Sequence, residues 1–130
     1  MERQDVYQIN IVIDCAIGQA GELAEFYTKL LGWELTHPAA NGWAAITAPN
    51  HTVYAFQEVE DYKRPTWPWQ KGEQGQMLHL DFWVEDLEAA VCYAESIGAQ
   101  QAGTQYFKTS RTMFDPAGHT FCLDTDGEED

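Results

Sequence analysis

Two residues that could do acid–base chemistry stand two positions apart in the segment MLHLDFWV, residues 77–84. In a strand, side chains two positions apart share a face at roughly 7 Å, so Asp81 could orient the imidazole of His79 or share a substrate with it. An imidazole held in this way can act as a general acid or base near neutral pH. The structural alternative is a buried histidine that only satisfies a neighbour, so His79 and Asp81 are candidate catalytic residues.

Cys122 and Arg111 are further candidates for contact with a ligand. In HTFCLDT (119–125), strand alternation places Cys122 on the face opposite Phe121 and Leu123. No basic residue stands near Cys122 in the sequence to lower its pKa, so a small packing residue is the alternative. Arg111, in SRTMFD, could pair with a carboxylate or phosphate of a ligand if it faces a cavity.

The first half of the chain supplies one set of elements to position such residues. YQINIVID (7–14) alternates, which predicts a half-buried strand whose polar face carries Gln8 and Asn10. GELAEFYTKLL (21–31) has apolar residues at helical spacing and is followed by Gly32, which predicts an amphipathic helix that ends there. Three short segments of strand composition follow, so the predicted order is βαβββ.

The second half repeats this order. A strand at 77–84 and a helix at about 87–97 precede three short segments at 99–105, 110–115 and 119–125. FYTKLLG (26–32) corresponds to CYAESIG (92–98), which indicates an internal duplication. The sequence therefore predicts an α+β fold of two βαβββ modules, at about 6–58 and 77–125, in a single domain spanning residues 1–130.

A long connection, VEDYKRPTWPWQKGEQGQ (59–76), joins the two modules. Its two prolines and many polar residues argue against a regular element. Trp67 and Trp69 either pack against the body or a second subunit, or belong to a lid over a ligand. The five tryptophans of the chain and this aromatic segment would fit the interface of a homodimer.

Composition and charge exclude several classes of partner. The formal net charge of −14 opposes binding to nucleic acid and to anionic membranes. No apolar stretch approaches the roughly 20 residues of a membrane span, and the start of the chain lacks the pattern of a signal peptide, so we expect a cytoplasmic protein. Three widely spaced cysteines favour free thiols over disulfides.

Three runs in order resemble the vicinal-oxygen-chelate superfamily, which includes glyoxalase I, bleomycin-resistance proteins and extradiol dioxygenases. They are FYTKLLGWE, HLDFWVEDLEAAV and FDPAGHTFCL, and the resemblance spans about residues 7–124. It implies that the eight strands of the two modules form an open trough with the helices outside and a ligand within. Tyr54, Phe56 and Trp83 would then line the trough together with the candidates above.

The resemblance also allows a test for a metal site. Catalytic members of the superfamily hold a divalent metal with side chains on the first, fourth, fifth and eighth strands. The fifth-strand position corresponds to His79, but the others fall on Asn10, on Tyr54 or Phe56, and on Cys122. Because a usual site needs three or more good ligands, we predict no metal and no cofactor, with His79 as the ligand if one is bound.

The sequence thus favours a glyoxalase-like protein that binds a small organic molecule without a catalytic metal. The alternative is a metal-independent isomerase, epimerase or lyase that uses His79 as general acid or base and Asp81 to orient it. A metal-dependent lyase or dioxygenase is a weaker alternative. A further possibility is a domain whose trough is filled by its own side chains, such as Tyr54, Phe56 and Trp83, and whose role is to assemble with a partner. A packed trough would exclude the binding function and the metal-independent enzyme.

Overall fold

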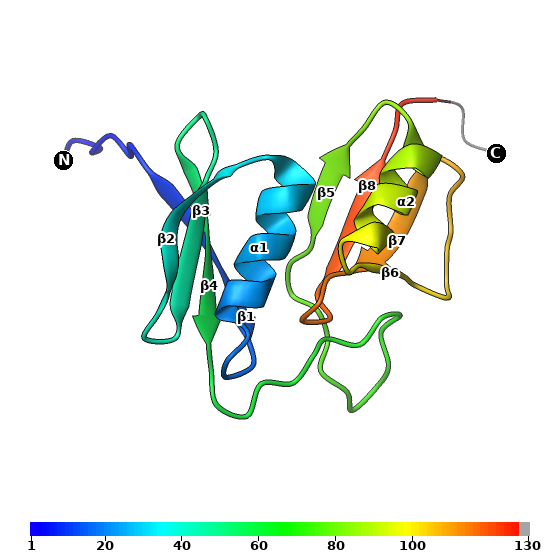
Figure 1. The fold of residues 1–130 in the computed structure, drawn as a ribbon, viewed down its shortest axis with the longest axis horizontal. Helices are drawn as coiled ribbons and strands as arrows, with labels where there is room; N and C mark the ends of the chain where they lie inside the picture. Colours follow the sequence, from blue (N-terminus) through cyan, green and yellow to red (C-terminus); the bar gives the residue numbers. More distant parts are fainter. Residues whose placement is uncertain (128–130) are drawn as a thin grey trace. The chain divides into compact units, whose positions relative to one another are not determined.

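The computed structural model describes residues 1–127 and divides into two compact units, Met1–Tyr62 and the remainder from Lys63 on. Each unit contains one four-stranded sheet and one helix, which confirms the predicted α+β class and its two βαβββ modules (Figure 1). We call these units the first and second modules and describe each by itself. The single domain and the shared trough stay predictions.

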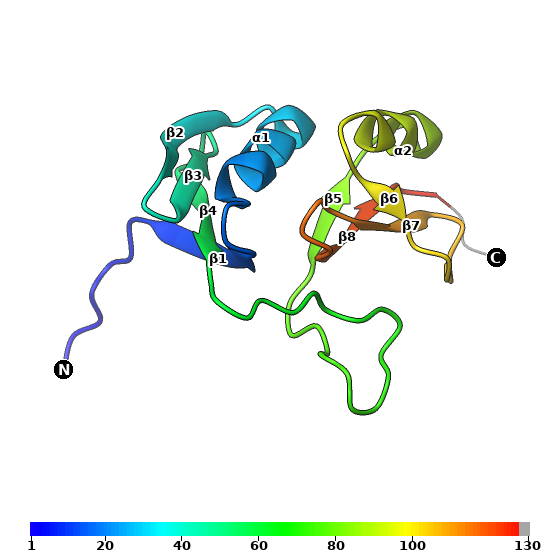
Figure 2. The same cartoon turned by 60° about the horizontal axis from the view of Figure 1, so that its bottom comes forward.

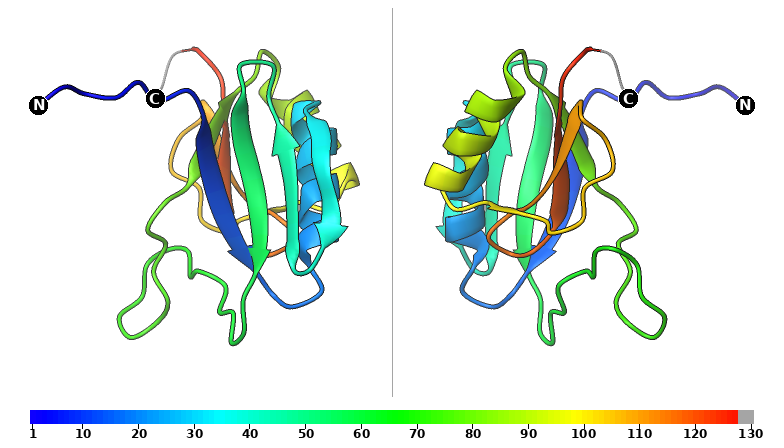
Figure 3. Two further views of the ribbon diagram at one scale, coloured as in Figure 1. Left: turned by 90° about the vertical axis from the view of Figure 1, so that its left-hand side faces the viewer. Right: turned by 90° about the vertical axis from the view of Figure 1, so that its right-hand side faces the viewer.

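The first module has the element order β1 (Ile9–Cys15), α1 (Ala20–Leu31), β2 (Glu34–Ala40), β3 (Trp43–Thr47) and β4 (Thr52–Glu58). Its sheet runs β1-β4-β3-β2, with β1 parallel to β4 and the other pairs antiparallel. Helix α1 covers one face of this sheet (Figure 3, left). Gly32 follows α1 with φ of 71°, so a left-handed residue ends the helix as predicted.

The core of the first module lies between α1 and β4. The ring of Tyr27 stacks on Phe56 at 5.6 Å and meets the edge of Tyr54 at 6.2 Å. Tyr54 is 6% exposed and Phe56 is fully buried. The prediction that these two residues line a ligand site is therefore wrong: they face α1, and the opposite face of β4 carries Val53, Ala55 and Gln57.

Glu58, at the end of β4, caps the first turn of α1. The residue before the helix, Gln19, makes no side-chain cap, but Glu58 Oε2 accepts a hydrogen bond from Ala20 N at 3.1 Å. Backbone N–H groups of Gly18 and Ala20 hold the pKa of the Glu58 carboxyl below its ordinary value of 4.5. An acidic group at a helix N-terminus is also favoured by the helix dipole.

We expect the stabilising effect of Glu58 to be lost in acid. Because its pKa is lower in the folded than in the unfolded chain, the ionised carboxylate stabilises the fold above the unfolded pKa, and this contribution disappears as the pH falls through the folded pKa. Glu58→Gln, which keeps an acceptor but not the charge, should have a lower melting temperature than the wild type at pH 7, and this difference should shrink as the pH is lowered to 3. An equal difference in melting temperature at both pH values would contradict this.

The second module repeats the arrangement with shorter strands. Its elements are β5 (Leu80–Trp83), α2 (Leu87–Ser96), β6 (Gln100–Gln101), β7 (Ser110–Phe114) and β8 (Thr120–Asp124). The sheet runs β5-β8-β7-β6, with β5 parallel to β8, and α2 lies over one face of it (Figure 2). Phe121 and Leu123 of β8 are buried, which is the predicted facing of this strand.

The connecting segment packs on the second module from Lys63 on. The guanidinium of Arg64 lies 5.1 Å from the centre of the Phe114 ring, at the end of β7. Arg64 also lies over Gly118, in the β7–β8 turn, where an added Cβ would come within 2.5 Å of Arg64 Nε. Gly118 is thus needed for its φ of 88° and for this close approach.

The turn between β7 and β8 is organised by Asp115, as the DPAG motif predicts. The Asp115 carboxylate is buried and accepts hydrogen bonds from the backbone N–H groups of Ala117 (2.9 Å) and His119 (3.0 Å).

In the described part of the chain no helix is long and apolar enough to cross a membrane. Cys15, Cys92 and Cys122 are free thiols, as expected.

Candidate functional site

The sheet of the second module presents a mostly polar face on the side opposite α2. Register places Asp81 of β5 beside Cys122 of β8, and Cys122 beside Thr112 of β7. Two residues further along each strand, Trp83 neighbours Asp124. Because side chains alternate along each strand, these residues project from the same face.

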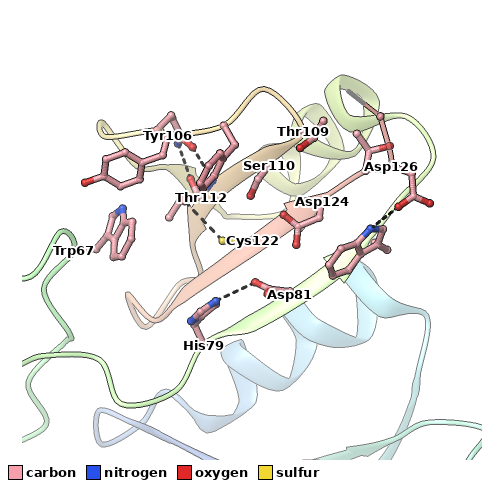
Figure 4. A pocket seen from close by; sticks show the side chains of 15 residues that line it. Trp67, His79, Asp81, Tyr106, Thr109, Ser110, Thr112, Cys122, Asp124 and Asp126 are labelled. Atoms are coloured by element: carbon pink, nitrogen blue, oxygen red, sulfur yellow. Dashed lines mark hydrogen bonds and ion pairs between the residues drawn. The ribbon is translucent and has the colours of Figure 1, made fainter. Parts of the chain in front are cut away.

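A pocket of about 540 Å³ opens on this face (Figure 4). All of its lining residues belong to the second module. They are Trp67, His79, Asp81, Trp83, Gln105, Tyr106, Phe107, Thr109, Ser110, Thr112, Cys122, Asp124, Thr125, Asp126 and Gly127. The volume lies within the range of about 300–1,000 Å³ that small-molecule sites occupy.

His79 and Asp81 form one wall of the pocket. His79 Nε2 lies 3.1 Å from Asp81 Oδ1, so the predicted pairing of imidazole and carboxylate is present. The two side chains are 41% and 42% exposed, and His79 stands just before the first residue of β5. The imidazole is therefore an accessible group of the pocket rather than a packed residue of the core.

Replacing His79 with alanine should leave stability nearly unchanged. An exposed ion pair contributes about 0–1 kcal/mol, and a substitution at an exposed site usually changes the free energy of unfolding by less than about 0.5 kcal/mol. Thermal denaturation of His79→Ala beside the wild type measures this. A loss of several kcal/mol would show that His79 has a structural role.

Cys122 lies at the floor of the pocket. Its Sγ is 3.7 Å from Thr112 Oγ1. Burial raises the pKa of the Cys122 thiol above its ordinary value of 9.0, hydrogen bonds from Thr112 and Ser110 oppose this, and the nearby carboxylates of Asp81 and Asp124 raise the pKa further. The neutral thiol is thus the form present near pH 7.

We predict that the three cysteines differ in their rates of alkylation. Cys92 is exposed and should react first with iodoacetamide, whereas Cys122 should react slowly at pH 7.5 because only its thiolate is nucleophilic. Asp81→Asn removes one cause of the raised pKa and should speed alkylation of Cys122 but not of Cys92. Mass spectrometry of peptides over time reports both rates, and an unchanged Cys122 rate would contradict the electrostatic effect of Asp81.

Residues 102–109 form a second wall, held in place by one glutamine. Gln105 Nε2 donates to the backbone oxygens of Ala102 and Thr112 at 2.9 Å each, and Gln105 Oε1 accepts from Thr112 N at 2.8 Å. Its side chain thus pairs with β7 where the two-residue strand β6 has already ended. This fixes the adjacent aromatic residues Tyr106 and Phe107 at the pocket.

The connecting segment contributes Trp67 to the same wall. The rings of Trp67 and Tyr106 meet edge to face at 6.0 Å, and both lie at one end of the pocket in Figure 4. Trp67 Nε1 is a buried donor with no hydrogen-bond acceptor within residues 1–127. The segment is therefore a wall of the pocket, to which Trp67 contributes its ring rather than its buried indole N–H.

Two residues predicted to contact a ligand lie elsewhere. Arg111 pairs with Glu88 of α2 and donates to Gln101 Oε1 at 3.0 Å, so it faces the helix side of the sheet and not the pocket. Trp69 is 70% exposed and does not line the pocket. Neither residue lines this pocket, because the face of β7 and the path of the connecting segment cannot be read from composition.

The remaining predicted residues divide between the modules. Trp83 and Cys122 line the pocket together with Trp67. Gln8 and Asn10 lie on β1 of the first module, where Gln8 Nε2 donates to Asn10 Oδ1 at 2.7 Å. Contact of these two amides with a ligand stays a prediction.

The chain thus contains two modules of the same βαβββ order, and the second has a polar pocket on the face of its sheet opposite the helix. These features define its class as a small protein built from a duplicated βαβββ unit. The glyoxalase-like domain family matches residues 10–123, so this chain belongs to that family, within the vicinal-oxygen-chelate superfamily to which its sequence is similar. A search of curated proteins gave no match.

Several solved structures share this fold. A glyoxalase/bleomycin resistance protein/dioxygenase family enzyme from Burkholderia phytofirmans is 12% identical, with a TM-score of 0.65 over 89% of this chain and 95% of that one. A glyoxalase-related enzyme from Fulvimarina pelagi is 16% identical, with a TM-score of 0.63 over 96% and 98%. An integron cassette protein from the mobile metagenome of V. cholerae is 17% identical, with a TM-score of 0.59 over 98% and 100%. At these identities the likeness concerns the fold alone.

The metal chemistry known in this superfamily can be tested against the donors of the pocket. Ligand atoms of His79, Asp81 and Cys122 lie within 4.8 Å of one another. Nitrogen, oxygen and sulfur donors suit zinc, and three protein ligands are the usual number at a catalytic zinc, so these residues fit such an ion in type and number. Bound there, it would supply a Lewis acid, but Cys122 would first have to lose its proton and Asp81 would have to release His79.

Proposed function

We propose that this protein binds a small organic molecule in the pocket of its second module. The observation that carries the proposal is the combination of a volume of about 540 Å³ with aromatic side chains around polar ones. Trp67, Tyr106 and Trp83 offer flat apolar surfaces, while His79 and Asp81 offer a donor and an acceptor. Ligand sites in proteins combine such features, and this form of binding requires no metal.

Two tryptophans of the connecting segment provide a matched test. Trp67 lines the pocket and Trp69 does not, although the two residues are separated only by Pro68. For an aromatic fragment found by NMR screening, Trp67→Ala should weaken binding about 5- to 30-fold, since a buried aromatic contact contributes about 1–2 kcal/mol. Trp69→Ala should change the affinity by less than about twofold. Equal effects of the two substitutions would contradict the proposed site.

A metal-independent enzyme is the second candidate, favoured by the 3.1 Å pair of His79 and Asp81. With Nε2 held by the carboxylate, His79 Nδ1 is the nitrogen that can take a proton from a ligand, and Asp81 would stabilise the imidazolium. Proton abstraction next to a carbonyl group is the simplest such step in an isomerase, epimerase or lyase.

Hydrogen exchange in a bound carbonyl compound would distinguish enzyme from binding protein. In D₂O the wild type should exchange the hydrogens next to the carbonyl, and His79→Gln should abolish this exchange while the fragment still binds. Exchange at the same rate with and without protein would contradict the enzyme and leave ligand binding as the only remaining function.

We further propose that the protein works as a homodimer. Val6, Tyr7 and Ile9 are exposed at and before β1, which is an edge strand of its sheet. An edge strand with exposed apolar residues is a common place for association. Light scattering should give twice the 14.7 kDa mass of one chain; a single-chain mass at micromolar concentration would exclude the dimer.

A further inference from the structure

Apart from the imidazole of His79, the charged groups that line the pocket are all acidic. The lining carries the carboxylates of Asp81, Asp124 and Asp126, and none of its side chains is lysine or arginine. The whole chain adds a net charge of −14. An anionic ligand would therefore meet repulsion at the site and at a distance.

Asp124 is the carboxylate that needs a partner. It is only 9% exposed, at the end of β8, and its side chain points into the pocket in Figure 4. No hydrogen bond or ion pair joins its carboxylate to another side chain within residues 1–127. Its carboxylate lines the pocket, so it can accept hydrogen bonds from a donor or a cation that enters there.

The other two carboxylates of the pocket, and the buried carboxylate of the β7–β8 turn, have protein partners. Asp81 pairs with His79 at 3.1 Å, and Asp126 Oδ1 accepts from Trp83 Nε1 at 3.1 Å. The buried carboxylate of Asp115 accepts two backbone N–H groups. Of the three pocket carboxylates, Asp124 alone has no such partner in the described residues, so its oxygens are the ones free to accept from a ligand.

The aromatic walls suit the same ligand chemistry. Trp67, Trp83 and Tyr106 present ring faces and edges around the cavity. The face of an aromatic ring attracts a cation, by about 0.5–2 kcal/mol depending on solvation. A positively charged group near Asp124 with an apolar body between the rings would satisfy both features of the pocket.

We infer that the ligand is an organic cation: an amine, amidinium or guanidinium carried on a small aromatic or apolar body. This inference rests on the proposed binding function and names the class of its ligand. The cationic N–H groups donate to Asp124, and the body packs against the indole rings. A neutral ligand of the same shape can donate only weaker, uncharged hydrogen bonds to Asp124, and an anionic ligand is repelled by it.

Three molecules of the same size test the inference: benzamidine as the cation, benzamide as its neutral analogue and benzoate as the anion. Titration of the ¹⁵N-labelled full chain by NMR gives their dissociation constants. We expect benzamidine to bind at least about tenfold more tightly than benzamide, which corresponds to one charge-assisted hydrogen bond, and benzoate not to bind. Sodium chloride should weaken the binding of benzamidine and leave the affinity for benzamide unchanged.

The outcomes separate the inference from the proposed function. If benzamide or benzoate binds the pocket as well as benzamidine does, the inference is overturned and the binding function stands. If none of the three shifts the signals of pocket residues, the inference fails, and a wider screen of aromatic molecules decides the binding function.

Two variants assign the preference to Asp124. Asp124→Asn keeps the shape of the side chain and should reduce benzamidine affinity about 5- to 10-fold, with benzamide unaffected. Glu95→Gln, on the exposed surface of α2, makes the same change in net charge away from the pocket and should have no effect. A folded Asp124→Asn protein that still prefers benzamidine to the same degree would overturn the inference.

Discussion

Replacing Phe121 with alanine should lower the free energy of unfolding of the second module by about 3–5 kcal/mol, the usual cost of deleting a buried aromatic ring. Phe121 has no exposed surface, and its ring lies 6.0 Å from that of Phe82 between the sheet and its helix. It also sits between Thr120 and Cys122 on β8, the strand that carries the floor of the pocket. The pocket should therefore be lost together with the stability.

Denaturation by urea measures the overall loss, and hydrogen exchange at the amides of β7 and β8 assigns it to this module. Phe82→Ala is the matched control, because Phe82 is only half-buried and should cost less. A loss below about 1 kcal/mol for Phe121→Ala would show that the sheet does not pack on α2 as described.

Phe56→Ala should have a comparable effect in the first module, again about 3–5 kcal/mol. Phe56 is fully buried and stacks on Tyr27 with an angle of 8° between the rings. The resemblance placed this residue on the ligand side, where its removal would change binding and barely change stability. The experiment thus decides whether Phe56 faces α1 or a ligand site.

Exchange of the β3 and β4 amides reports the stability of the first module, and the affinity for an aromatic fragment reports the site. Val53→Ala, on the opposite face of the same strand, removes less apolar surface and should cost less. If Phe56→Ala weakened fragment binding while the exchange rates stayed unchanged, the facing described for β4 would be wrong.

The order of elements could be predicted because its signals are local. Alternation in residues 9–15, helical spacing before Gly32 and the repeat at Gly98 each depend on a few neighbouring residues. The main deviation is β6, which has only two residues because Gln105 takes over the pairing with β7. A side chain that replaces backbone pairing leaves no periodic signal.

The facing of β4 could not be predicted from its own residues. Val53, Tyr54, Ala55 and Phe56 are all buried, so the strand shows no alternation of apolar and polar residues. Its facing follows from its neighbour: Tyr54 pairs with Ile11 and Phe56 with Ile13, on the side of β1 that faces the helix. Such pairing involves residues of another strand, so it cannot be read from the residues of β4 alone.

The candidate site was predicted in part. His79, Asp81, Trp83 and Cys122 follow from alternation on β5 and β8, and Asp124 shares the predicted face of Cys122. Tyr106 and Phe107 were missed because they stand in an irregular segment whose position depends on the hydrogen bonds of Gln105. The salt bridge of Arg111 with Glu88 joins residues far apart in sequence, so neither residue alone indicates it.

The central claim is that the second module holds a small-molecule site, and the indole N–H signals of the five tryptophans test it most directly. A screen of small aromatic molecules against the ¹⁵N-labelled protein, with signals assigned by Trp→Phe variants, should find molecules that shift Trp67 and Trp83. Trp33, which packs on Tyr54, and the exposed Trp69 serve as internal controls and should not move. A screen in which no molecule shifts Trp67 and Trp83, or in which only Trp33 and Trp69 respond, would contradict the account.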